Sequence, residues 1–267
     1  MTSIGYSHPA RRSDLQRTAI LLLAILQVLV TLLPSLGLGE PIGERSDAVR
    51  TAITPAGWAF SIWGLLYAGS LAYAIYQFLP AQRTNALLAR IGWASAGAFL
   101  GNALWALYTQ FVDLNALSVV IITGTLLCLL ACYRRFATLP RRLTRGEQFL
   151  VALPLSGLAA WLTAATIVNI AASLKFHGVD PGETAPLAGA AVVASGGVIA
   201  SAAIWNGRGN PWYALIFLWA LAGIHARQTS ANGIAVAVIA AALLVVASTL
   251  VRLGRAADRE RWFGTGG

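Results

Sequence analysis

Long, almost uncharged runs of apolar residues constrain this chain more than any other feature of its sequence. A helix needs about 20 such residues to cross the hydrocarbon core of a bilayer. Hydrophobic residues make up 57% of the 267 residues and charged residues only 11%, which excludes an ordinary soluble domain. The sequence therefore predicts an all-α integral membrane protein. Seven spans are predicted, at Thr18–Leu38, Ala56–Leu79, Leu87–Tyr108, Ala116–Tyr133, Phe149–Leu174, Ala185–Trp205 and Ile234–Leu253.

An eighth run, Trp212–Ile224, is shorter and would reach only about 20 Å as a helix. Lysine and arginine concentrate in the cytoplasmic loops of membrane proteins, so their distribution decides whether this run is a span. With eight spans and both termini in the cytoplasm, all but four of the 19 basic residues lie inside; removing the short span would weaken this bias. We therefore predict about eight transmembrane helices in the plasma (inner) membrane. The basic residues expected outside are Arg45, Arg50, Lys175 and Arg227.

Two other interpretations of simple features are weaker. The arginines before the first run and a small-residue pattern at Ser35-Leu36-Gly37 also fit a cleaved secretory signal, but the length of the run favours a retained helix. The formal net charge of +9 indicates contact with the headgroups of the lipid bilayer, and no nucleic-acid partner is expected because no basic recognition module is present. Cys128 and Cys132 are expected to be small buried hydrophobic side chains.

Nothing in the sequence indicates catalysis or a metal site. No nucleophile is paired with a base, and His8, His177 and His225 fall in tails, loops or span ends, where we expect solvated side chains. An axial haem ligand from His177 or His225 is the alternative. All ten acidic residues fall outside the spans or at their ends, whereas an ion-coupled carrier usually needs a carboxylate inside the membrane. The sequence thus predicts a protein that is neither an enzyme nor a coupled transporter.

Polar side chains within the third and fifth spans point to an enclosed pocket. Asn102 and Trp105 are three residues apart and share a helix face, and Trp161 and Asn169 lie on one stripe of the fifth span. An amide in lipid must find a partner or a ligand. Asn102, Trp105 and Asn169 are expected in the outer half of the membrane, together with Trp63 of the second span. The alternative is that the amides only hold neighbouring helices together.

Three segments resemble the TspO/MBR family, the tryptophan-rich sensory proteins related to the translocator protein. Thr54–Tyr67 is similar to the aromatic entry to the family's second helix. Gly101–Trp105 resembles its third-helix Leu-Asn-x-x-Trp signature, with Gly in place of Leu, and Trp161–Asn169 matches its fifth-helix pattern in spacing. The chain departs from the family in lacking a Pro between the first two tryptophans, in the displaced Pro154, and in lacking the Lys-Pro-x-Trp element of the first loop.

The resemblance covers about Thr18–Lys175 and implies a five-helix TspO-like bundle, followed by three additional C-terminal helices. The expected division is a cytoplasmic tail at residues 1–17, the bundle at 18–175, the additional helices at 176–253 and a second cytoplasmic tail at 254–267. The resemblance also implies a pocket, capped by the first loop, for a planar hydrophobic ligand such as a porphyrin, a haem-like tetrapyrrole or a sterol-like lipid. No cofactor is required.

Indole faces suit a planar ring, and amides can hold its polar substituents. Arg45 and Arg50 are the lid residues that could pair with a propionate. The residues predicted to bind the ligand are Trp58, Trp63, Asn102, Trp105, Trp161, Thr166 and Asn169.

Two alternatives to a ligand-binding receptor or sensor remain at this stage. The first is a transporter that moves such a ligand without coupling to an ion. The second is a structural or regulatory subunit, either as a homodimer or within a larger membrane complex, with the three added helices as its docking surface. Gly189 and Gly196 in the sixth span offer a face on which a helix can pack closely, and the pair Gly97 and Gly101 offers another in the third.

Overall fold

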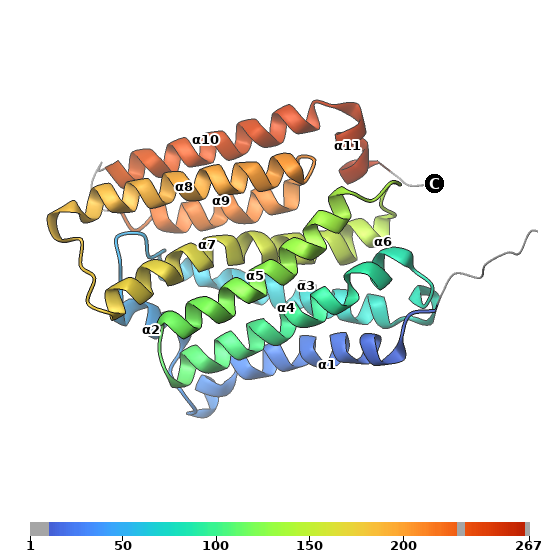
Figure 1. The fold of residues 1–267 in the computed structure, drawn as a ribbon, viewed down its shortest axis with the longest axis horizontal. Coiled ribbons are helices and arrows are strands. Elements are labelled where there is room, and N and C mark those ends of the chain that lie inside the picture. The colour runs from blue at the N-terminus through green and yellow to red at the C-terminus, as the bar shows by residue number, and fades with distance from the viewer. Residues whose placement is uncertain (1–10, 229–232, 265–267) are drawn as a thin grey trace, which may run out of the picture.

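A computed structural model describes residues 11–228 and 233–264, which contain helices and no strands (Figure 1). His8 lies outside these residues, as do much of the predicted 1–17 tail and the last three residues of the 254–267 tail. The longer helices are α1 (Asp14–Thr31), α3 (Ile62–Phe78), α4 (Ala86–Phe111), α5 (Ala116–Ala137), α7 (Leu153–Phe176), α8 (Ala185–Asn206), α9 (Pro211–His225) and α10 (Gly233–Leu253). The shorter elements are η1 (Leu33–Leu36), α2 (Ile42–Ala48), η2 (Gly57–Ser61), η3 (Pro80–Gln82), α6 (Arg145–Glu147), η4 (Gln148–Ala152), η5 (Gly182–Thr184) and α11 (Ala256–Phe263).

The helices confirm the predicted all-α membrane fold. Six helical stretches in the described residues are long and apolar enough to cross a membrane, and the predicted spans on α4 and α9 are also helical. Some boundaries differ from those predicted. The first span was expected to reach Leu38, but α1 ends at Thr31, because Pro34 falls in the next turn and Gly37 has a φ of +77°. The start of the second span forms the 3₁₀ segment η2.

Asparagine side chains begin three of the helices. The side chain of Asn85 accepts hydrogen bonds from two backbone N–H groups in the first turn of α4, and Asn115 does the same for α5. Asn210 caps α9, where Pro211 occupies the first helical position and needs no hydrogen-bond partner. Each cap satisfies donors that the first turn of a helix leaves free. This local chemistry explains why the short helix α9 begins where it does.

Two groups of helices meet at α7. An N-terminal unit comprises α1, α3, α4, α5 and α7, and a C-terminal unit comprises α8, α9 and α10, with α9 packed against α7 (Figure 1). In the apolar window of α7, 78% of the residues are buried, against 28–39% in the other candidate spans. Helix α7 is therefore the centre of the molecule and has little contact with lipid.

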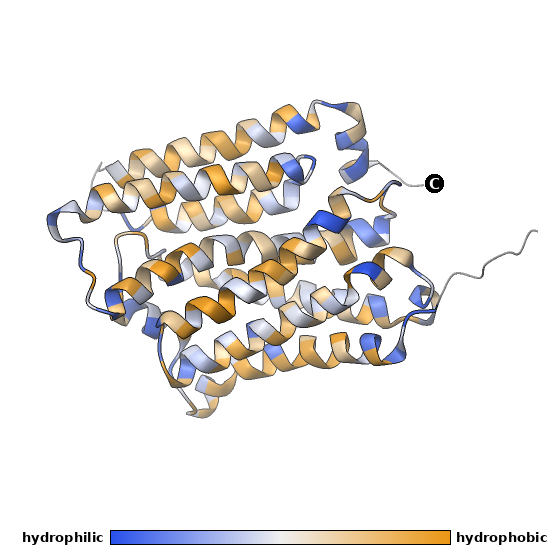
Figure 2. Cartoon of the chain, in the orientation of Figure 1, coloured by the Kyte–Doolittle hydropathy of each residue, from blue (hydrophilic) through white to orange (hydrophobic). Residues whose placement is uncertain are grey.

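Both described ends of the chain lie at the same end of the bundle, which we call the termini end, and the loop between α1 and α3 lies at the opposite, first-loop end (Figure 1). The hydrophilic residues gather at these two ends and the shafts of the helices are mainly apolar (Figure 2). Of the basic residues in the described part, Arg45, Arg50, Lys175 and Arg227 lie at the first-loop end. Both described ends of the chain therefore lie on one side of the bundle, as an even number of spans requires.

The predicted C-terminal tail contains a docked helix. In α11, Arg261 is 6% exposed and donates hydrogen bonds to the carbonyls of Phe136 and Leu139, at 3.0 and 2.8 Å. Trp262 is buried and donates to the carbonyl of Arg208. Burial lowers the pKa of Arg261, and the positive charge of Arg208 lowers it further. Because α11 carries mostly polar residues, hydropathy alone gave no sign that it would fold back onto α5 and the α8–α9 loop.

Glycine residues bring helices close together, as predicted for Gly97 and Gly101. A Cβ at Gly101 would collide with the side chain of Thr125 on α5. The tightest helix contact in the C-terminal unit is at Gly197, where an added Cβ would lie 2.5 Å from the Cβ of Ala241 on α10. Such positions confirm close packing of backbones in both units.

Candidate ligand-binding site

Three tryptophans from three helices meet in the N-terminal unit. The ring of Trp63 on α3 stacks on Trp105 of α4, with centroids 6.4 Å apart, and meets Trp161 of α7 edge-on at 6.0 Å. Tyr67, also on α3, stacks on Trp63 with ring centroids 5.1 Å apart. Offset stacks and edge-on contacts are the favourable geometries for aromatic pairs. The sequence placed these indoles in one interior, and the structure brings them together.

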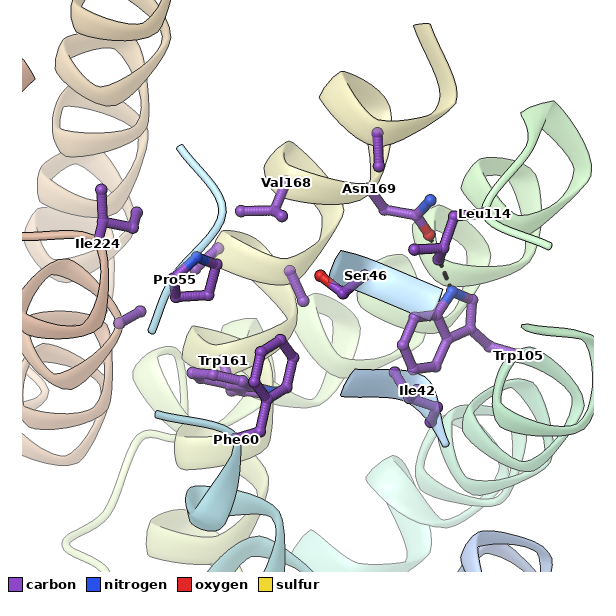
Figure 3. A pocket seen from close by; sticks show the side chains of 14 residues that line it. Ile42, Ser46, Pro55, Phe60, Trp105, Leu114, Trp161, Val168, Asn169 and Ile224 are labelled. Atoms are coloured by element: carbon purple, nitrogen blue, oxygen red, sulfur yellow. Dashed lines mark hydrogen bonds between the residues drawn. The ribbon is translucent and has the colours of Figure 1, made fainter. Parts of the chain in front are cut away.

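A hydrogen-bonded chain fixes the orientation of Trp105. Its indole N–H donates to the side-chain oxygen of Asn169 at 2.9 Å (Figure 3), and the Asn169 amide donates to the hydroxyl of Ser118 at 2.8 Å. The three residues come from α4, α7 and α5, and all are buried. In an apolar interior, such a chain costs free energy to break, because each member would leave a partner unsatisfied. The hydrogen bond between Trp105 and Asn169 therefore holds the Trp105 ring in one orientation.

A small enclosed cavity of about 50 Å³ adjoins these residues (Figure 3). The indole N–H of Trp161 lines it and has no hydrogen-bond partner in the described residues, although it is buried. The walls come from α2, α4, α7, α9 and the loops beside them. The lining residues are Ile42, Ser46, Pro55, Phe60, Trp105, Leu114, Trp161, Ala164, Ala165, Val168, Asn169, Ala172, Ala220 and Ile224.

A wide cavity of about 570 Å³ lies beside it, between the first loop, the end of α1 and α3. Ile42 and Phe60 line both cavities and so form the partition between them. Gln110, which is 1% exposed, lines the wide cavity, and its buried side-chain oxygen has no hydrogen-bond partner in the described residues. The lining residues are Thr31, Pro34, Ser35, Pro41, Ile42, Gly43, Phe60, Trp63, Gly64, Tyr67 and Gln110.

Neither cavity is lined by a charged side chain. Arg45, predicted as a lid cation, forms an ion pair with Glu40 at 3.0 Å and donates to the carbonyl of Gln110 at 3.4 Å. It thus fixes the first loop to the end of α4 and lies behind the cavity wall. Arg50 lies elsewhere, in a separate crevice that is described below. The structure therefore does not bring either arginine to the aromatic residues.

Three other residues predicted to bind the ligand also lie outside both cavities. Asn102 is fully buried and lines neither cavity, but its amide donates to Gln27 of α1 at 3.1 Å and to the hydroxyl of Tyr67, which lines the wide cavity, at 3.5 Å. Trp58 is 47% exposed and packs edge-on against Trp219 of α9. Thr166 is buried, and its hydroxyl has no partner in the described residues. Helical spacing placed Asn102 beside Trp105, and in the structure Asn102 bonds to Tyr67, a wall residue of the wide cavity, as well as to α1.

Helix α9 supplies contacts that the sequence did not predict. The indole N–H of Trp219 donates to the carbonyl of Ala59 at 2.9 Å, and Arg227 donates to the carbonyl of Pro55 at 3.0 Å. The guanidinium of Arg227 also pairs with Asp47 at 3.0 Å. At Gly223, a Cβ would lie 2.6 Å from the Cβ of Ala59, so the helix passes directly against the loop. Helix α9 therefore holds the first loop over the cavities and lines the smaller one.

The remaining candidate groups lie away from the cavities. His177 and His225 are exposed and line neither of them. Cys132 is buried, Cys128 is half-buried, and the two are not joined by a disulfide. The described residues hold no group of three metal-ligating side chains. The chemistry available at the site is therefore aromatic stacking with a few amide and hydroxyl groups.

Comparison with protein families gives one match: a family model described as TSPO-like protein matches residues 15–251. No curated protein and no solved structure matches the chain. The matched region runs from α1 into the last turn of α10. It therefore includes the C-terminal unit, which the three sequence motifs left uncovered.

Proposed function

We propose that this chain, which belongs to the TSPO-like protein family, is a membrane receptor or sensor that binds a planar hydrophobic ligand under its first loop. Porphyrin-like tetrapyrroles and sterol-like lipids are the two ligand classes that we consider. We further propose that the termini end faces the cytoplasm, because the basic residues of the described part concentrate there.

The observation that carries the proposal is the pair of cavities that share Ile42 and Phe60. The wide cavity, at about 570 Å³, is within the range of about 300–1,000 Å³ that is usual for small-molecule sites. The enclosed cavity is too small for such a ligand by itself. Rotation of Phe60 would join the two, and a flat ring could then lie along Trp63 and reach Trp105. Stacked aromatic walls favour a flat ligand, because its faces keep contact on both sides.

Because no charged side chain lines either cavity, the site favours an uncharged ligand. A buried carboxylate without a partner is costly in an apolar site, and neither cavity offers it a cation. A neutral planar molecule therefore suits the interior better than a dicarboxylate. A porphyrin with free propionates would have to turn them towards the first loop, where Arg45 lies behind Gln110.

The test is quenching of tryptophan fluorescence by protoporphyrin IX and by its uncharged dimethyl ester. We expect saturable quenching by both, with the ester binding at least as tightly as the acid. Trp105→Phe should weaken binding, because Asn169 then loses its donor and the wall shifts. The matched control is Trp212→Phe, since Trp212 packs against Phe149 at the termini end. Equal affinity of the two variants, or unsaturable quenching of the unmodified protein, would contradict the proposal.

A further inference from the structure

A third hollow, of about 330 Å³, lies at the first-loop end between α7 and α8. Its apolar wall is made from small side chains, among them Ala171 of α7 and Ala185 and Ala188 of α8, which keep the two helices from filling the space between them. Residues 50–53 of the first loop close it from the side. We call this hollow the α7–α8 crevice. The residues that line it are Arg50, Thr51, Ala52, Ile53, Ala171, Leu174, Lys175, Val179, Asp180, Pro181, Ala185, Ala188, Gly189 and Val192.

The crevice is distinct from the proposed ligand site. It has no lining residue in common with the two aromatic cavities. Its apolar depth is made by aliphatic side chains and contains no aromatic ring, so nothing in it favours a planar ligand. Leu174 and Val179 at its mouth are 50% and 53% exposed, which leaves it accessible from the side of the bundle. An aliphatic chain would fit these walls better than a ring system.

Two cations lie at the rim. The ammonium of Lys175 donates to the backbone carbonyl of Arg50 at 2.8 Å, which uses one of its three N–H groups and holds the Lys175 side chain beside Arg50 at one edge of the crevice. Arg50 pairs with Asp47 at 3.1 Å, but Asp47 is also bound by Arg227. Arg50 and Arg227 thus share one carboxylate, and Lys175 forms no ion pair with it, which leaves positive charge in excess.

The one acidic residue of the lining does not cancel this excess. An oxygen of the Asp180 carboxylate accepts a hydrogen bond from the backbone N–H of Gly182 at 3.0 Å, which ties it to its own loop. Asp180 is exposed to solvent, where its charge is screened. The rim therefore carries a net positive charge above an aliphatic interior. The ends of spans also lie at the level of the lipid headgroups.

From this arrangement we infer that the α7–α8 crevice binds an anionic phospholipid of the surrounding bilayer. One acyl chain lies between α7 and α8, and the phosphate contacts Arg50 and Lys175. An amphiphile of this kind satisfies both parts of the crevice, the aliphatic walls and the cationic rim, whereas a free anion would leave the walls empty. The inference is independent of the planar ligand, since it uses a different cavity.

The experiment is native mass spectrometry of the purified protein titrated with phosphatidylglycerol and, separately, with phosphatidylcholine of the same acyl chains. We expect one phosphatidylglycerol to bind about tenfold more tightly than phosphatidylcholine, because both carry a phosphate but only phosphatidylcholine adds a quaternary ammonium, which the two rim cations repel. Arg50→Gln with Lys175→Gln should remove this preference. Arg50→Lys with Lys175→Arg, which keeps the charge, should retain it.

Two further variants complete the design. Arg134→Gln with Arg135→Gln removes the same charge from an exposed pair at the termini end and should leave phosphatidylglycerol binding unchanged. Ala188→Phe fills the crevice and should abolish the bound lipid whichever headgroup it carries. Equal affinity for the two lipids in the unmodified protein would overturn the inference. So would loss of binding in the Arg134 and Arg135 variant to the same degree as in the Arg50 and Lys175 variant.

Discussion

The two helical units of this protein are built from different interactions. The N-terminal unit contains buried amides and indoles, such as the chain from Trp105 through Asn169 to Ser118. In the C-terminal unit, α8 and α10 approach each other through small residues such as Gly197 and Ala241. Polar chains of this kind fix the orientation of individual side chains, whereas small-residue contacts bring whole backbones together. The comparison suggests that the first unit holds the ligand and the second supports it.

Helix α9 of the C-terminal unit makes both apolar and polar contacts with the N-terminal unit. Its apolar face lines the enclosed cavity through Ala220 and Ile224, while Trp219 and Arg227 bind the first loop. Towards α7 it carries polar contacts, including the hydroxyl of Tyr213 on Thr163 at 2.8 Å. The C-terminal unit is therefore part of the proposed site and not an attachment to it. The family match across residues 15–251 agrees with this, since it treats both units as one region.

The largest effect is expected from Gly197→Leu, which tests whether the C-terminal unit depends on backbone approach. A Cβ at this position lies only 2.9 Å from the Cα of Ala241, so α8 and α10 must separate. We expect a loss of about 3 kcal/mol of stability, measured as a lower midpoint of thermal unfolding in detergent. Gly124→Leu on α5 is the control, because no atom lies within 4 Å of its added Cβ. Equal midpoints for the two variants would show that the small-residue contact is unimportant.

A smaller loss is expected from Asn169→Ala, which tests the polar construction of the N-terminal unit. The substitution leaves the indole N–H of Trp105 and the hydroxyl of Ser118 without their partner. The expected cost is about 2 kcal/mol in the same unfolding measurement. Asn206→Ala is the control: that amide is exposed and bonds only to the carbonyl of Ala202. If Asn169→Ala and Asn206→Ala have the same unfolding midpoint, the hydrogen bonds of Asn169 do not stabilise this unit.

The smallest effect on stability is expected from Arg227→Ala, which tests the link between the units. Because Arg227 is partly exposed, its loss should cost about 1 kcal/mol or less. Its main consequence should be a looser first loop. Ser46 in α2 is part of that loop and is 7% exposed, so Ser46→Cys would report the loosening: its labelling rate with a soluble maleimide should rise about fivefold.

That labelling experiment needs Cys128 and Cys132 replaced by alanine in every variant. Arg50→Ala is the matched control, because Arg50 shares the carboxylate of Asp47 but makes no contact with α9. Its labelling rate should stay near that of the parent. An unchanged rate in Arg227→Ala would mean that α9 does not hold the loop closed, although the planar ligand could still bind.

Patterns local to one helix were predictable from the sequence, and contacts between distant helices were not. Hydropathy and the arginine distribution gave the spans, including the short α9. The eight-residue interval between Trp161 and Asn169 correctly placed both beside the enclosed cavity. Asn102 lines neither cavity, because helical spacing tells which residues share a face but not which neighbour that face meets. Its amide donates to Gln27, 75 residues away on α1, and to Tyr67, which lines the wide cavity, so its role in ligand binding stays a prediction.

In the loops and the C-terminal tail, too, contacts between distant segments were not predictable from the sequence. Charge placed Arg45 and Arg50 at the end opposite the termini, but Glu40 and Asp47 of the same loop pair with them and compete with an anionic ligand for these cations. The docking of α11 depends on Arg261 finding backbone carbonyls at the end of α5, which no periodicity in residues 254–267 reveals. Sequence patterns therefore predicted the membrane fold, while the closure of the site required the structure.

The most direct test of the proposed site compares Gly64→Leu with Gly124→Leu. Both glycines lie on helices, and an added Cβ at either meets no atom within 4 Å, but only Gly64 lines the wide cavity. Both variants should therefore fold, and only Gly64→Leu should raise the Kd for protoporphyrin IX dimethyl ester, by about tenfold or more. Unchanged affinity in Gly64→Leu, or an equal loss in Gly124→Leu, would contradict binding in the cavity under the first loop.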